Sequence, residues 1–378
     1  MSRLQTERAL FQLLSISLGN MSPDDLPAYD AQTWLSLYKE SKKQSIVGIV
    51  WSAVEKLPLQ NQSLPLNIKM GWYGQVYLLE QRNITLDGAC AKLTEKLESI
   101  SFDSFVAKGQ SLSQLYDEPL RRDCGDIDLF VFPRQSKFPR YDLKIEYIRR
   151  KIDSLGLKKL GYIVYHHAEW EFDHIPVEIH FRPSFLTNPW HNKKYQTWFE
   201  RQVESRCWSK NRGYYSPVIS FNLVYLLQHL FFHLLFEGSK LRQIYDYAIL
   251  LKHLAKIPDA DIIKAGACAT IEEVGMGRFA RGIMWVLQQT CGLPAAHLIM
   301  EPNKKLGEYL LHEIMESGFY GKTDTRNSQN RRMKRFIRRA RLFHLFYSEI
   351  AWDIPFRLWH WWWRRTNQIK YHWPHLEK

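Results

Sequence analysis

Two aspartates separated by a single residue, Asp126 and Asp128, begin an apolar segment of the chain. Side chains alternate in direction along a β-strand, so both acids are expected on one face and Ile127, Leu129 and Val131 on the other. Neighbouring carboxylates repel each other unless a cation lies between them, and carboxylate oxygens are ligands that Mg²⁺ prefers. The spacing predicts a divalent metal site; the alternative is a pair of solvated acids at a strand end.

A third acid lies in a later strand-like segment, Val177–Phe181. There Glu178 and His180 share one face, and apolar residues occupy the other. If this segment neighbours the Asp126–Asp128 strand, three carboxylates converge. Such a group can hold Mg²⁺, or Mn²⁺ in its place, and orient an attacking hydroxyl for in-line phosphoryl transfer.

Residues suited to phosphate binding precede the aspartates. Lys108 and Gly109 follow the strand candidate Ser104–Ala107, where a glycine lets the backbone approach a phosphate closely. Arg121 and Arg122 lie just upstream of the acids, and guanidinium groups bind phosphate oxygens in a bidentate manner. The sequence therefore predicts a phosphate site beside the metal site.

The stretch from Lys108 to Leu129 resembles the signature of the uncharacterised bacterial nucleotidyltransferase-like family within the DNA polymerase β-type nucleotidyltransferase superfamily. The matching positions are Lys108, Gly109, Leu112, Tyr116, Pro119, Arg122, Gly125, Asp126, Ile127, Asp128 and Leu129. The segment Val177–His180 resembles the family's later strand. The resemblance implies an α+β fold, with a small mixed sheet of the polymerase β-like type embedded in a mainly helical protein.

The resemblance also implies a reaction: Mg²⁺-dependent transfer of a nucleoside monophosphate from an NTP, with release of pyrophosphate. It assigns catalysis and metal binding to Asp126, Asp128 and Glu178. The nucleotide would contact a further set of residues, namely Lys108, Gly109, Ser111, Arg122 and Arg242. The acceptor, a hydroxyl or a phosphate, stays open, as does the choice of NTP.

Four other polar residues are candidates for substrate contact: His180, His229, His233 and Asp246. His229 and His233 stand four residues apart and fit either a packed helix edge or the substrate cleft. Arg242 and Asp246 have the spacing of a helix-surface ion pair, the alternative to contact with phosphate.

A dense group of histidines and aspartate lies around the later strands: His166, His167, Asp173, His174 and His180. A zinc site is one interpretation. Their positions are mixed between strand faces and a turn, which favours a polar hairpin surface, and His180 alone is expected near the acids.

Two other functions fit the same motif. A DxD pair also marks glycosyltransferases that bind a nucleotide sugar through a metal. A member of the nucleotidyltransferase-like family without turnover, which binds only a nucleotide or a partner, is the other alternative.

Four ranges are expected along the chain. They are a helical region at 1–100, the catalytic core at 101–187, a helical domain closing the cleft at 188–320 and a basic, Trp-rich tail at 321–378. In the first range, Asp30 is expected to be the N-cap of a helix that runs towards Lys42. Within the core, strands are expected at Ser104–Ala107, Ile127–Phe132, Leu160–Tyr165, Glu169–Phe172 and Val177–Phe181. After Asn188 only helices are expected, and Thr323–Gln329 is the best linker candidate.

The net charge of +13 is concentrated in the tail, where 321–378 holds 14 Lys and Arg against 4 Asp and Glu. Basic residues followed by several Trp fit an anionic membrane surface or a polyanion such as RNA; no DNA-specific signal is present. A terminal helical hairpin, with its Trp residues packed on the body and its arginines solvated, is the interpretation that we favour.

The cellular setting is expected to be reducing. The 5 cysteines are far apart, which argues against a disulfide scaffold. No secretory signal is evident, and the apolar run Leu223–Phe236 is short for a bilayer span, so a buried core helix is expected. We therefore expect a cytoplasmic protein, which would be peripheral to the inner face of the membrane if the tail binds there.

Overall fold

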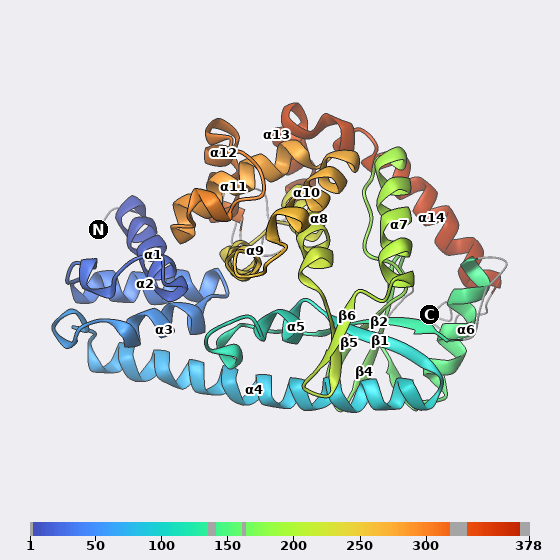
Figure 1. Cartoon of the computed structure of the whole chain (residues 1–378), viewed down its shortest axis with the longest axis horizontal. Helices are drawn as coiled ribbons and strands as arrows, with labels where there is room; N and C mark the ends of the chain where they lie inside the picture. The colour runs from blue at the N-terminus through green and yellow to red at the C-terminus, as the bar shows by residue number, and fades with distance from the viewer. Residues whose placement is uncertain (1–2, 135–140, 161–163, 318–330, 371–378) are drawn as a thin grey trace. The chain divides into compact units, whose positions relative to one another are not determined.

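The computed structural model describes residues 3–134, 141–160, 164–317 and 331–370. It is a mainly helical protein with a small mixed sheet, so the expected α+β class is confirmed (Figure 1). The chain divides into two compact units. Unit 1 comprises Met1–Asn83, Leu112–Asp123 and Asn222–Leu342, and unit 2 comprises Ile84–Ser111, Cys124–Phe221 and Phe343–Lys378. The four expected ranges stay a prediction.

A mixed sheet is the centre of unit 2. Its strands are β1 (Phe102–Ala107), β2 (Ile127–Pro133), β3 (Lys158–Lys159), β4 (His167–Phe172) and β5 (Ile175–His180). Their order is β1-β2-β5-β4-β3, and β2 pairs with β5 in parallel while the other neighbours are antiparallel. The strand expected over Leu160–Tyr165 falls partly outside the described residues; the strand observed nearby is β3.

One face of this sheet is apolar and carries the core of the unit. Alternate residues of β2 and β5, among them Ile127, Leu129 and Ile179, pack with helices α4 (Leu66–Ser99) and α6 (Tyr141–Asp153). Because strand side chains alternate, burying this set leaves the intervening polar residues on the opposite face. The core thereby fixes which way the candidate acids point.

The other face is covered in part by aromatic side chains. Phe105 and Phe130 stack with ring centroids 4.8 Å apart, and Phe130 also contacts Phe199 of α7 (Pro189–Glu204). The N-cap of α7 is Asn188, whose side chain accepts hydrogen bonds from the Trp190 and His191 amides. The aromatic layer holds α7 against the sheet.

A hairpin lies where only helices were expected, which corrects the prediction for the residues after Asn188. Strands β6 (Trp208–Asn211) and β7 (Tyr214–Pro217) pair antiparallel, and Gly213 turns between them at φ +84°. Four-residue strands carry too little alternation to stand out in the sequence. Packing outside the hairpin supports them, since Trp208 stacks on Phe132 with centroids 5.5 Å apart.

Unit 1 is built from helices. They include α1 (Arg3–Leu18), α2 (Ala31–Lys43), α3 (Val47–Lys56), the first part of α4, α9 (Leu241–Leu254), α10 (Ala260–Glu273), α11 (Gly277–Cys291), α12 (Lys304–Ser317) and most of α8 (Ile219–Phe236). The Asp30 side chain accepts a hydrogen bond from the Thr33 amide, which confirms it as the N-cap of α2. Short 3₁₀ turns connect several of these helices. A further 3₁₀ turn, Pro119–Arg121, lies against α3.

Helix α8 contains the longest apolar run. Among the described residues it is the one helix whose length and composition would allow a membrane span, and 78% of that window is buried within the protein. A mostly buried core helix passes the same test, which agrees with the core helix expected for Leu223–Phe236.

Helices α13 (Arg331–Ile350) and α14 (Asp353–Lys370) form the end of the described chain. The linker expected at Thr323–Gln329 lies outside the described residues. Within unit 2, the buried Glu349 carboxylate accepts hydrogen bonds from the Thr187 and Asn188 amides, which ties this end of the chain to the start of α7. Trp363 packs against the core, whereas Trp361 and Trp362 are exposed.

Candidate active site

The two carboxylates at the centre of the site come from adjacent parallel strands. Asp128 of β2 and Glu178 of β5 are register partners. Both lie on the sheet face opposite the apolar core, as the alternation of the two strands predicted. His180, two residues along β5, donates from its Nε2 to both acids, with Nε2 3.0 Å from Asp128 Oδ1 and 3.1 Å from Glu178 Oε2. The imidazole therefore bridges the acid pair.

Lys108 reaches the Asp128 carboxylate from the end of β1. Ala107 is the register partner of Asp128, so the next residue stands close to the acids. Lys108 takes a positive φ of 49°, and its Nζ lies 2.7 Å from Asp128 Oδ1. Gly109 then begins the short helix α5 (Gly109–Ser113), in which Ser111 is buried. The predicted phosphate loop is thus placed beside the predicted metal ligands.

Asp126 stands one residue before β2 and keeps contact with solvent. Partial desolvation by the surrounding protein, followed by repulsion from Asp128 and Glu178, raises the pKa of its carboxyl above the ordinary value. A divalent cation would relieve that repulsion. Asp126 is therefore in electrostatic contact with the acid pair and available from the solvent side.

The two paired acids have lowered pKa values despite burial. Desolvation alone would raise the pKa of Asp128, but the charges and hydrogen bonds of Lys108 and His180 outweigh it. Desolvation is likewise outweighed at Glu178, where the hydrogen bond from His180 lowers the pKa. Both groups are ionised at neutral pH. The pKa of His180 is raised, because its bonds to the two acids outweigh the cost of its own burial.

The donor set fits a hard divalent cation. Asp128, Glu178 and His180 each offer a ligand atom, and these atoms lie within 4.8 Å of one another. Ionised carboxylates are the ligands of Mg²⁺, which usually binds through one or two of them and through substrate phosphates. Asp128, Glu178 and the neighbouring Asp126 would hold it. Without a bound cation, the Lys108 ammonium group balances part of the negative charge of these carboxylates.

The predicted nucleotide contact Arg122 lies in unit 1, in a buried ion pair. Its Nε and one terminal nitrogen each lie 2.7 Å from an oxygen of Asp246, and the Tyr116 hydroxyl donates to the same carboxylate over 2.6 Å. Burial would raise the pKa of Asp246, but Arg122 holds it below the ordinary value. These contacts give Arg122 and Asp246 a structural role; contact with substrate stays a prediction.

The same network corrects one interpretation of the sequence. One of the two interpretations of Arg242 and Asp246 was an ion pair on the surface of their helix. The ion pair formed by Asp246 is with Arg122, from a distant stretch of the chain. Arg242 instead donates to the Asp123 carbonyl over 2.5 Å. Helical spacing indicates that Arg242 and Asp246 can meet. The bidentate pair with the buried Arg122 guanidinium is the stronger interaction, and it is the one that forms.

His229 and His233 also lie in unit 1 and contact each other on α8, with their Nε2 atoms 2.9 Å apart. His233 Nδ1 lies 2.8 Å from Glu237 Oε2, and Gln243 lies next to His229. The pair forms a local hydrogen-bonded cluster along the helix. Its contact with a substrate stays a prediction.

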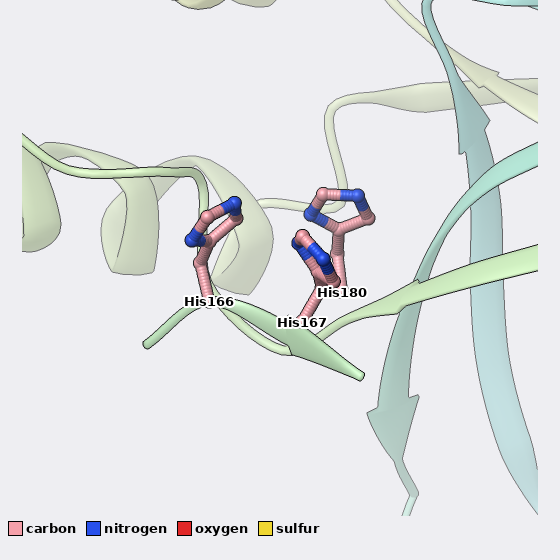
Figure 2. A group of neighbouring side chains, drawn as sticks. All are labelled: His166, His167 and His180. Carbon is pink, nitrogen blue, oxygen red and sulfur yellow. The ribbon is translucent and has the colours of Figure 1, made fainter. Parts of the chain in front are cut away.

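The sequence analysis missed two members of the histidine group near the acids. His166 and His167 were interpreted as a polar hairpin surface, but the structure gathers them with His180, as Figure 2 shows. His174, in contrast, lies in the turn with its side chain 98% exposed. The missing information was the pairing of β4 with β5, which makes His167 the register partner of His180.

A small mixed sheet with acids paired across its strands, inside a mainly helical protein, is consistent with a nucleotidyltransferase domain. Residues 30–292 match the family described as uncharacterised nucleotidyltransferase, so the chain belongs to that family. Comparison with curated proteins and with solved structures gave no match. Family membership, with a group of acidic residues able to bind a divalent metal, supports nucleotidyl transfer as the general function.

Proposed function

We propose that this protein is a Mg²⁺-dependent nucleotidyltransferase that moves a nucleoside monophosphate from an NTP to a hydroxyl or phosphate acceptor. The observation that carries the proposal is the parallel register of β2 and β5, which sets Asp128 opposite Glu178. Membership of the nucleotidyltransferase family favours this reaction over glycosyl transfer from a nucleotide sugar. Mn²⁺ has the same preference for oxygen ligands and is expected to replace Mg²⁺.

The residues of the site supply charge and position. Bound Mg²⁺ would neutralise triphosphate oxygens and hold them in line with the acceptor. Lys108, at the end of β1, is placed to bind phosphate oxygens once the triphosphate competes for its ammonium group. Asp126 and Asp128 would hold the cation, and Glu178 would hold it or accept the acceptor's proton.

The bonds change as in any nucleotidyl transfer. The acceptor oxygen bonds to the α-phosphorus, the bond from that phosphorus to the bridging oxygen of pyrophosphate breaks, and pyrophosphate leaves. When the acceptor is a hydroxyl and Glu178 is the base, the hydroxyl proton passes to the Glu178 carboxylate and then to solvent. Most of the acceleration comes from positioning and charge neutralisation, since such displacements need little covalent chemistry from the protein.

The contact between Lys108 and Asp128 favours a second candidate function, that of a family member that binds a nucleotide without turning it over. A carboxylate already paired with an ammonium group at 2.7 Å has less charge to offer a cation. The two candidates share the site and differ only in whether pyrophosphate is released.

Pyrophosphate release from each of the four NTPs, with Mg²⁺ and with a chelator, tests the proposal. A mixture of hydroxyl and phosphate acceptors, with water as the default acceptor, serves for the first screen. We expect release with Mg²⁺ that falls on the order of 100-fold or more in Asp128→Asn. Glu171→Gln is the matched control, because Glu171 lies on β4 and pairs with Lys158. Nucleotide binding without release would favour the second candidate.

Location and further partners stay proposals. Exposed Trp361 and Trp362 and the basic composition of 321–378 support association with an anionic membrane surface or a polyanion. A cytoplasmic protein that is peripheral to the inner face of the membrane would combine both properties.

A further inference from the structure

Three histidines of unit 2 converge next to the carboxylates, and the backbone explains why. His167 and His180 are register partners on β4 and β5, so their side chains share one face. The carbonyl of His166 accepts hydrogen bonds from the Phe181 and Arg182 amides, which fixes His166 beside the end of β5. The ring centroid of His166 lies 4.4 Å from that of His167 and 5.6 Å from that of His180.

One nitrogen of each ring in this cluster, Nδ1, is not used by other protein groups. Among the described residues, the buried Nδ1 atoms of His166, His167 and His180 have no hydrogen-bond partner. His167 Nδ1 lies 3.7 Å from Glu178 Oε2, beyond hydrogen-bond distance. A buried polar atom without a partner costs free energy unless a ligand satisfies it. Three such atoms in one place indicate a common ligand.

His180 is oriented for metal binding. Its Nε2 lies within hydrogen-bond distance of two ionised carboxylates, which only accept, so Nε2 carries a proton. In the neutral ring the lone pair is then on Nδ1, and Figure 2 shows a nitrogen of His180 facing the other two rings. A metal-ligating histidine usually donates its other N–H to a carboxylate, which is the arrangement found here.

We propose that His166, His167 and His180 form a second metal site, which takes a borderline transition-metal dication such as Zn²⁺. Each ring offers one nitrogen, and the three atoms lie within 4.8 Å of one another. Zinc–nitrogen bonds of about 2.0–2.1 Å require nitrogens about 3.3 Å apart, so small side-chain rotations close the site. Imidazole nitrogens select such an ion over Mg²⁺, which prefers oxygen.

We call the proposed histidine site the nitrogen site and the carboxylate site of Asp126, Asp128 and Glu178 the oxygen site. The two sites share no ligand atom, but His180 connects them. The neighbouring acids offset the charge of the bound ion, since Glu178 and Glu169 lie 3.7 and 3.9 Å from nitrogens of His167. An ion on His180 Nδ1 also fixes the ring that bridges Asp128 and Glu178. Binding at the nitrogen site is therefore expected to position the two catalytic acids, without contact between that ion and the substrate.

Cobalt binding tests the site on the full chain. The chelator-treated protein is titrated with Co²⁺ in excess Mg²⁺, which occupies the oxygen site, and visible absorption reports a four-coordinate ion. We expect one equivalent of Co²⁺, displaced by Zn²⁺, and binding at least tenfold weaker in His166→Ala and His167→Ala. His174→Ala is the matched control and should bind as the wild type does, because its side chain lies in the exposed turn.

Three results would overturn the proposal: no stoichiometric Co²⁺ binding, binding unchanged in folded His166→Ala, or binding lost only in Glu178→Gln. Far-UV circular dichroism establishes that each variant folds. X-ray absorption of the Zn²⁺-loaded wild type needs no variant and should show three imidazole ligands; a spectrum of oxygen ligands alone would also overturn it. None of these measurements depends on turnover, so their failure is distinct from failure of the proposed transferase activity.

Discussion

Asp128 and Glu178 face each other across the only parallel strand pair among the described residues, β2 with β5. Glu178 also faces Glu169 across the antiparallel pair with β4. Carboxylates this close repel one another, and the Lys108 ammonium group and the N–H of His180 offset that repulsion in the protein itself. The acids are thus held ready to bind a divalent cation, whose charge is greater than that of the ammonium group.

Replacement of Lys108 should have opposite effects on the two ligands of the site. Lys108→Met removes the ammonium group 2.7 Å from Asp128, so Mn²⁺ alone should bind more tightly. The Mg²⁺–NTP complex should bind more weakly, by about tenfold or about 1.4 kcal/mol, because a phosphate ligand is lost. Titration calorimetry measures both affinities.

Lys158→Met is the control for this prediction, since Lys158 pairs with Glu171 at the exposed end of β4. It should change neither affinity. Equal weakening of Mn²⁺ and nucleotide binding in Lys108→Met would show that Lys108 supports the fold of the site and does not compete with the cation.

The pair formed by Arg122 and Asp246 should be important for the stability of unit 1. Arg122→Met leaves a buried carboxylate without its guanidinium, which costs about 3–5 kcal/mol. The double variant Arg122→Met/Asp246→Leu removes both charges and should recover part of the loss. Denaturant unfolding measures the free energies, and a double variant less stable than Arg122→Met would contradict the account.

Asp246 should also make stability depend on pH. Its pKa is lower in the folded protein than in the unfolded chain, so its contribution is present above about pH 4 and is lost as the pH falls through the folded value. Asp246→Asn should therefore be less stable than the wild type at pH 7, and the gap should narrow below about pH 4. Thermal unfolding across this range is the measurement; a gap independent of pH would point to a lost hydrogen bond alone.

The exposed tryptophans of α14 should contribute to membrane binding. Trp361 and Trp362 are 53% and 58% exposed, and the guanidinium of Arg365 lies over the Trp361 ring. Flotation with anionic vesicles should recover the wild type, and the variant with both tryptophans changed to Ala should bind several-fold less. Neutral vesicles are the control, and equal recovery of wild type and variant would exclude these side chains as the contact.

Much of the fold could be predicted from local patterns. The alternation around Asp128 correctly predicted that Ile127, Leu129 and Val131 face the apolar core, and Asp30 correctly marked the start of α2. Both signals depend on residues close together in sequence. The prediction that Asp128 and Glu178 lie close together needed one further assumption, that β2 and β5 are neighbouring strands. The resemblance to the nucleotidyltransferase family supplied that assumption.

The features that were missed depend on long-range packing. The hairpin of β6 and β7 is stabilised by contacts such as Trp208 with Phe132, which no local pattern contains. The gathering of His166 and His167 with His180 follows from strand register, and Asp246 pairs with Arg122 and not with its helical neighbour. Sequence spacing limits which residues can meet, whereas tertiary packing decides which of them do.

Mn²⁺ binding followed by electron paramagnetic resonance tests most directly whether Asp128 and Glu178 share one divalent cation. The wild type, Asp128→Asn, Glu178→Gln and the control Glu171→Gln are titrated with and without a non-hydrolysable NTP analogue. We expect each of the first two substitutions to weaken binding at least tenfold and Glu171→Gln to leave it unchanged. Wild-type affinity for Mn²⁺ in both Asp128→Asn and Glu178→Gln would contradict the account.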